Sequence, residues 1–377
     1  MLLRNKCWTT VLFLLAATFP VSAQETESIN TTSVFFSTVQ AGPMTVTNPQ
    51  SFPAPVAIPH SPYAAPPDTF CPDSGCDGTS DHFTPFMLGD FANILVNLGS
   101  DIKIAEGESP RPVDRVFYRF NYYDNINPSR FNQPISDIHN VQLYRNSFGF
   151  EKTFMNGTVS IGLRVPFNTI DAEGKGYVVS PPPGGIVTPG DAGFDTTVFG
   201  NISAIVKAIL LEDKATGSLV SAGATIVFPT AATKLVDPGP STLSYIQPFG
   251  GFILNRGDFF VQGFTSITLP VAGAESIIMF NDLGAGYFIY RDRSGASWLR
   301  SVAPTLEIHV TTPIRQPQGV TEFGFIDNVT INDTVDITMG STFEFVNKAT
   351  LGVGFVIPVC STRPFDYEIL AQLNYRF

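Results

Sequence analysis

Apolar and polar residues alternate along most of the chain after residue 113. In the clearest run, 159–167, the odd positions hold Val, Ile, Leu, Val and Phe, whereas the even positions hold Ser, Gly, Arg and Pro. The same period of two recurs at 202–210, 220–228 and 351–359. Successive side chains of a β-strand point to opposite faces, so this period predicts strands with one apolar face. The sequence therefore predicts an all-β fold.

About twelve runs reach the roughly 9–11 residues that a tilted strand needs to cross a membrane. We predict strands at 114–123, 141–155, 157–167, 197–211, 217–229, 243–255, 258–269, 278–291, 297–310, 333–346, 348–359 and 365–377. Short polar turns, such as Asn156-Gly157, alternate with longer connections, such as 168–196. Tight periplasmic turns and long external loops are typical of transmembrane barrels. We predict an antiparallel up-and-down transmembrane β-barrel over 114–377. The alternative is a soluble antiparallel sandwich or barrel, whose apolar face would point inward.

The residues before the predicted barrel indicate export. Residues 1–23 combine basic Arg4 and Lys6, a short apolar run and the small-residue site Val21-Ser22-Ala23. They predict a signal peptide and a mature chain beginning at Gln24. Residues 24–82 are rich in Pro, Ser and Thr, which predicts a flexible periplasmic segment. Residues 83–113 hold several apolar residues, and we expect a small ordered element there, either a plug inside the barrel or an extra pair of strands.

The C-terminal run, 367–377, alternates between apolar and polar positions and ends in Tyr375, Arg376 and Phe377. A terminal Phe with an aromatic residue two positions before it resembles the signal that the outer-membrane barrel assembly machinery reads. Together with the signal peptide, it predicts insertion into a bacterial outer membrane. Tyr375 and Phe377 are the expected assembly signal, and membrane lipid and the assembly machinery are the expected partners.

Three stretches support a family resemblance: 109–117, 148–154 and 363–377. They resemble a set of uncharacterised, porin-like bacterial outer-membrane barrel proteins. More distantly, the chain is similar to the long-chain fatty-acid transporter family and to the phenol-degradation MetA-type barrels, which implies transport of hydrophobic solutes. The fatty-acid transporters carry an N-terminal Asn-Pro-Ala motif. This chain lacks the motif. The similar tripeptide Asn127-Pro128-Ser129 lies in a predicted external loop.

Composition narrows the possible partners and the redox chemistry. The formal net charge is −11, so nucleic acid is not an expected partner. Cys71 and Cys76 lie in a turn-rich sequence of an exported chain and are predicted to form a disulfide. Cys360 is left over and is expected to be unpaired or inert.

The alternation also predicts which charged side chains face the lumen, because they lie opposite the apolar face. These candidates are Arg119, Arg145, Glu151, Arg164, Lys207, Glu307, His309, Asp336, Glu344, Glu368 and Arg376. Unpaired charges in a narrow lumen are costly, so they should pair or line water. Two interpretations remain open: an ion-pair network that braces a nearly closed barrel, and a charged constriction that filters solutes.

A channel or transporter for small solutes is the predicted function. The alternatives are a structural or adhesive barrel without transport, and a lipid-modifying outer-membrane enzyme. The chain has four histidines but no Gly-x-Ser-x-Gly elbow, zinc-ligand spacing or phosphate loop. His139, in the compact Ser136-Asp137-Ile138-His139, lies in a predicted external loop. We therefore expect no catalytic residue, no cofactor and no metal site.

Overall fold

The structure is a computed structural model that describes residues 83–90, 103–126, 138–179, 187–191, 193–231, 244–271, 276–292, 294, 296–315, 321–322, 325–326, 333–360 and 363–377. Four predictions lie outside these residues. They are the signal peptide at 1–23, the flexible segment at 24–82, the Cys71–Cys76 disulfide and the central part of 83–113.

The described residues form β-strands joined by turns and irregular segments. The strands are β1 (Arg115–Asp124), β2 (Ile138–Phe154), β3 (Val159–Val179), β4 (Val187–Asp191), β5 (Phe194–Phe199), β6 (Ser203–Asp213), β7 (Ser218–Val227), β8 (Tyr245–Arg256), β9 (Phe259–Pro270), β10 (Ile277–Tyr287), β11 (Tyr290–Arg291), β12 (Leu299–Arg315), β13 (Thr321–Glu322), β14 (Phe325–Ile326), β15 (Thr334–Phe345), β16 (Ala349–Pro358) and β17 (Tyr367–Arg376). Among the described residues, no helix is long and apolar enough to cross a membrane.

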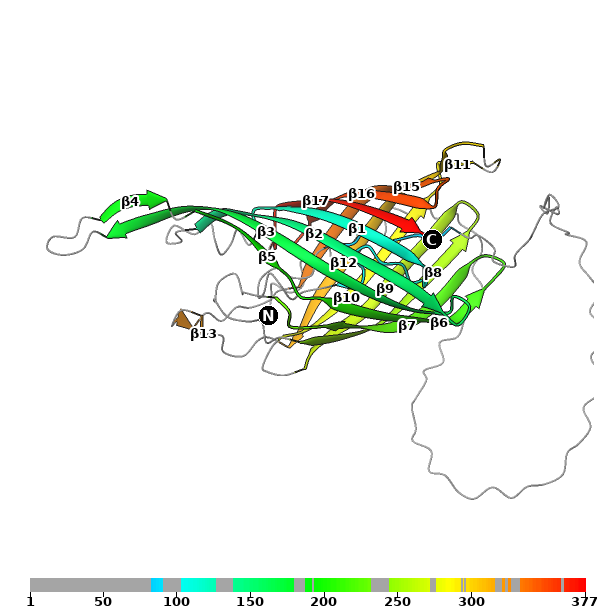
Figure 1. The fold of residues 1–377 in the computed structure, drawn as a ribbon, viewed down its shortest axis with the longest axis horizontal. Coiled ribbons are helices and arrows are strands. Elements are labelled where there is room, and N and C mark those ends of the chain that lie inside the picture. The colour runs from blue at the N-terminus through cyan, green and yellow to red at the C-terminus, as the bar shows by residue number, and fades with distance from the viewer. Residues whose placement is uncertain are drawn as a thin grey trace, which may run out of the picture. The chain divides into compact units, whose positions relative to one another are not determined.

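The main sheet closes on itself as an antiparallel barrel (Figure 1). Neighbours in sequence pair in order, β10 pairs with β12, and β1 pairs with β17 along its whole length. The ring contains twelve strand positions, because β5 and β6 follow one another along the same edge of β3. The predicted fold class and strand number are confirmed.

Several boundary predictions are wrong. The strand predicted at 197–211 is two strands, β5 and β6, and the one predicted at 297–310 continues to Arg315. The largest error concerns β3. The strand predicted at 157–167 continues to Val179 as β3, so the first part of the predicted loop at 168–196 is strand. The reason is pairing: β3 continues beside β2 and β5, and its last residues pair with β4. Hydrogen bonding to these neighbours keeps the backbone extended where the apolar alternation has faded.

The two faces of the barrel have opposite polarity. Ile161 and Val206 point outward and are 46% and 41% exposed, whereas their neighbours Ser160 and Lys207 point inward and are almost fully buried. Large apolar residues such as Phe148 and Leu373 continue this outer surface on other strands. A soluble sandwich would show the reverse arrangement, so the predicted apolar faces are confirmed.

Tight turns join the strands at one end of the barrel, here termed the tight-turn mouth. They lie at 155–158, 214–217, 257–258 and 346–348. Asn156 and Gly157 both adopt positive φ, at 57° and 80°, which fits the predicted hairpin. The C-terminus lies at this end, and β4 lies at the other end (Figure 1).

Candidate functional site

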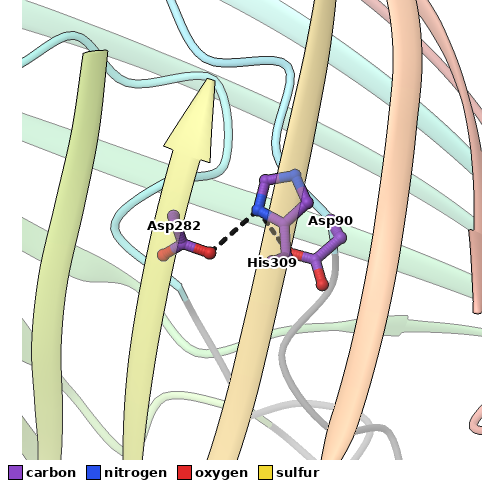
Figure 2. Close-up of side chains that lie close together, drawn as sticks. All are labelled: Asp90, Asp282 and His309. Atoms are coloured by element: carbon purple, nitrogen blue, oxygen red, sulfur yellow. Dashed lines mark hydrogen bonds and ion pairs between the residues drawn. The ribbon is translucent and has the colours of Figure 1, made fainter. Parts of the chain in front are cut away.

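Two short stretches of chain lie against the inner face of the barrel and are here termed the inner segment: a first limb, 83–90, and a second limb, 103–113. The backbone N–H of Met87 donates to the carbonyl of Glu108 at 2.9 Å, which joins the two limbs. Nearly all residues of both limbs are buried. The inner segment is irregular rather than strand, and in Figure 2 irregular ribbon lies inside the barrel, behind the near strands and in front of the far ones.

The first limb is bound to β1 and β12 through its backbone. The amides of Leu88 and Gly89 donate to the two carboxylate oxygens of Glu307, at 2.8 and 2.7 Å. On the other side, Arg119 Nη1 donates to the carbonyl of Leu88 at 2.5 Å. Charged side chains from two separate strands therefore satisfy the peptide groups of a segment that has no sheet partner.

The side chain of Leu88 fits a hollow made by inward-facing glycines. A Cβ placed on Gly340, Gly352 or Gly354 would lie only 2.3, 2.8 or 3.1 Å from a Leu88 methyl carbon. Any larger residue would therefore meet Leu88. The absence of side chains on β15 and β16 at this level makes room for the first limb.

Five buried cations come from four adjacent strands and are here termed the basic wall: Arg115, Arg119, Arg145, Arg164 and Lys207. They belong to β1, β2, β3 and β6, which are consecutive in the sheet. In the described residues of these four strands, Glu151 is the one buried carboxylate. It pairs with Arg115 at 3.1 Å and with Lys207 at 2.7 Å.

Two glutamates of the second limb form ion pairs with four of the five cations of the basic wall. Glu106 contacts Arg145 Nη1 at 2.9 Å and Arg164 Nη1 at 3.1 Å. Glu108 contacts Arg115 Nη2 at 2.6 Å, Lys207 Nζ at 3.0 Å and Arg164 Nη2 at 3.3 Å. Arg164 thus bridges the two carboxylates. Each ion pair is almost fully removed from solvent, where unpaired charges would be costly.

The strands that run from β10 to β17, which pairs with β1, carry buried acids, here termed the acidic wall: Asp282 on β10, Glu307 on β12, Asp336 on β15 and Glu368 on β17. His309 of β12 stands in register between Asp282 and Asp336. Its Nδ1 lies 2.8 Å from Asp282 Oδ1 and 3.3 Å from Asp90 Oδ1 of the first limb (Figure 2).

These three side chains could in principle hold a metal ion, because one ligand atom of each lies within 4.8 Å of the others. However, Lys103 of the second limb already contacts both carboxylates, pairing with Asp90 and lying 2.6 Å from Asp282 Oδ1. The group is therefore an ion-pair cluster that binds both limbs to the acidic wall. His309 is fully buried within it.

The structure places the sequence candidates in two settings. Nine of the eleven are buried and inward-facing. Seven of these belong to the basic wall or the acidic wall, Glu151 contacts the basic wall and His309 contacts the acidic wall. The other two, Glu344 and Arg376, pair with each other at 2.5 Å and are each 16% exposed. They border a cavity of about 590 Å³ at the tight-turn mouth, which is also lined by Phe83 at the start of the first limb.

Sequence reasoning missed six charged residues of this site: Asp90, Lys103, Glu106, Glu108, Arg115 and Asp282. Strand phase could have identified two of them. Arg115 lies on the same face as Arg119, and Asp282 lies opposite the outward Leu283. The other four lie in the irregular inner segment, where no period assigns a face.

The C-terminal residue meets the start of β1 at the closing seam of the barrel. The Phe377 amide donates to the carbonyl of Asp114 at 3.3 Å, and Tyr375 points outward. Asp114 also carries a carboxylate with a shifted pKa. Burial raises this pKa, but hydrogen bonds from Lys152 and Thr153 lower it by more, so the pKa lies below its ordinary value. The role of Tyr375 and Phe377 as an assembly signal stays a prediction.

The expectation for Cys360 is wrong. This residue is disulfide-bonded and 7% exposed. The other three cysteines lie outside the described residues. The Cys71–Cys76 pair stays a prediction.

No protein-family model matches the sequence. No curated protein matches it either. Among solved structures, an outer-membrane channel from Pseudomonas putida F1 is similar with a TM-score of 0.44 and 10% identity, over 71% of this chain and 96% of that chain. The NanC porin has a TM-score of 0.40 and 7% identity, over 70% and 98%. The β domain of the Bordetella autotransporter BrkA has a TM-score of 0.40 and 10% identity, over 70% and 100%. Likenesses of this extent assign neither a family nor an activity to the chain.

Proposed function

We propose that this chain is an outer-membrane channel whose lumen is closed by the inner segment, and that small water-soluble solutes pass when the segment withdraws. The membrane location is supported by the apolar outer surface of a closed barrel. The predicted signal peptide and the terminal Phe377 agree with it. The inner segment acts as the plug that was one of the two expectations for 83–113.

The observation that carries the proposal is how the inner segment is bound. Charged side chains of the barrel hold both limbs through ion pairs and hydrogen bonds to buried groups. Apolar contacts, such as those of Met87 with the buried cluster of Phe249 and Phe264, add to this hold. A buried ion pair contributes little more than an apolar pair of the same size would, because desolvation offsets the attraction. Withdrawal would return these charges to water, so the emptied lumen would be wettable. A polar wall favours water-soluble solutes over the hydrophobic solutes implied by the family resemblance.

The test is single-channel conductance of the refolded full chain in a planar bilayer, with Glu106→Gln as the loosening variant. The substitution removes the charge that Arg145 and Arg164 share, and breaking a buried pair costs about 3–5 kcal/mol. Each 1.4 kcal/mol changes an equilibrium about tenfold. Because the loss falls on the closed state, we expect rare openings in the unmodified chain and at least about tenfold more in the variant.

The matched control is Glu344→Gln, which removes an ion pair between two barrel strands at the mouth and leaves the inner segment's contacts intact. Its open fraction should match that of the unmodified chain. If both variants fold, as judged by a heat-modifiable gel shift, yet no chain conducts, the channel proposal is wrong. The second candidate, a structural barrel, would then be favoured, since it too explains a lumen filled by paired charges.

A further inference from the structure

The buried charges of the barrel are sorted by sign around the lumen. The basic wall on β1, β2, β3 and β6 holds five cations and one carboxylate, whereas the acidic wall holds four carboxylates with His309. The inner segment follows the same division. Its two glutamates meet the basic wall, and its Lys103 meets the acidic wall.

Withdrawal of the inner segment would affect the two walls unequally. On the acidic wall, Asp282 and Glu307 keep His309 within 2.8 and 3.3 Å, and Glu368 keeps a hydrogen bond from Asn121 at 2.5 Å. On the basic wall, Arg164 loses all its polar partners among the described residues. Its two ion pairs and its bond to the carbonyl of Glu106 all go to the second limb.

The second limb therefore occupies a site built for anions. Glu106 and Glu108 place two carboxylates, two residues apart in sequence, on four cations that are at least 96% buried. Arg164 divides its guanidinium between them, with Nη1 on one carboxylate and Nη2 on the other. Guanidinium groups match the planar, two-oxygen geometry of carboxylates, which favours recognition of a defined anion over general attraction.

We propose that the basic wall is a binding site for small organic dianions, dicarboxylates above all, and that these are the solutes of the channel. The inner segment acts as a tethered competitor whose Glu106 and Glu108 occupy the two acidic-group positions. A monoanion would leave one of these positions empty, and a dication would be repelled. The inference rests on the proposed function for passage through the barrel, but the binding itself does not depend on it.

Equilibrium binding of radiolabelled succinate to the refolded full chain in detergent tests the site without any need for conductance. Glu106→Gln/Glu108→Gln removes both competing carboxylates, so we expect its affinity for succinate to rise at least tenfold over that of the unmodified chain. Adding Arg164→Gln should abolish the gain, and Arg164→Lys should restore part of it. Butyrate and 1,4-diaminobutane, which match succinate in chain length, should bind at least tenfold more weakly. Glu344→Gln is the control that should leave succinate binding unchanged.

A second measurement covers the case in which the double variant does not fold. Succinate added to the unmodified chain should speed hydrogen exchange at the Leu88 and Gly89 amides, because it displaces the second limb and loosens the first limb that is joined to it. Butyrate should have no such effect. Equal binding of succinate and butyrate, or tighter binding of the diamine, would overturn the dianion site. Succinate binding without conductance would support the dianion site and contradict the channel function. Cation-selective conductance that succinate does not change would support the channel function and contradict the dianion site.

Discussion

At the scale of single residues, the contact between Leu88 and Gly352 tests whether the lumen is fitted to the inner segment. A Cβ on Gly352 would meet only Leu88 Cδ2, at 2.8 Å, whereas a Cβ on Gly340 would also strike the backbone oxygen of Val353. Gly352→Ala should therefore strain the inner segment and leave the sheet intact. Overpacking of this kind costs about 1–3 kcal/mol, measurable as a lower free energy of unfolding in urea.

The rescue variant is Gly352→Ala combined with Leu88→Ala, in which the added methyl group fills part of the space that Leu88 leaves. Leu88→Ala alone should cost about 2–5 kcal/mol, since it leaves a void against the glycines. The two losses should therefore not add in the double variant. Additive losses would show that Leu88 does not occupy the glycine hollow in the folded chain.

At the scale of elements, the outward face of the strands gives the next prediction. Val206→Arg and Ile161→Arg place a charge on the exposed apolar surface of β6 and β3. Each should cost about 2–4 kcal/mol if the position lies near the middle of a bilayer. The measurement is folding into lipid vesicles across a urea series, with Thr216→Arg in an exposed turn as the control. Equal stability of all three variants in lipid would mean that this surface does not face a membrane.

The elements also show what the sequence can predict. A period of two is a property of each strand alone, so it identified all twelve barrel strands, their inward faces and residues such as Arg164 and Glu307. The end of β3 was missed because its last residues are held by β4 and not by their own alternation. Glu106 and Glu108 were missed because they lie in an irregular segment and most of their partners, such as Arg145 and Lys207, lie 39 to 99 residues away along the chain. Only the closed barrel brings those partners together.

At the scale of the whole molecule, the channel and the structural barrel differ in whether the inner segment moves independently of the strands. Three amides report on it: Met87 bonds to Glu108, and Leu88 and Gly89 bond to Glu307. A channel requires that these bonds open while the barrel stays closed. We expect the three amides to exchange with solvent as a group, faster than the paired amides of β15 and β16, because cooperative units of lower stability open first.

Hydrogen exchange of the full chain in lipid, followed by mass spectrometry or NMR, measures both groups at once. Glu106→Gln should speed exchange of the three inner-segment amides by about tenfold or more and leave the strand amides unchanged, because the substitution weakens only the second limb's hold on the basic wall. Glu344→Gln should change neither group. If the inner-segment amides exchange only as fast as the strands, even with Glu106→Gln, the segment leaves only when the barrel unfolds. The chain would then be a structural barrel that the inner segment stabilises, without a path for solutes.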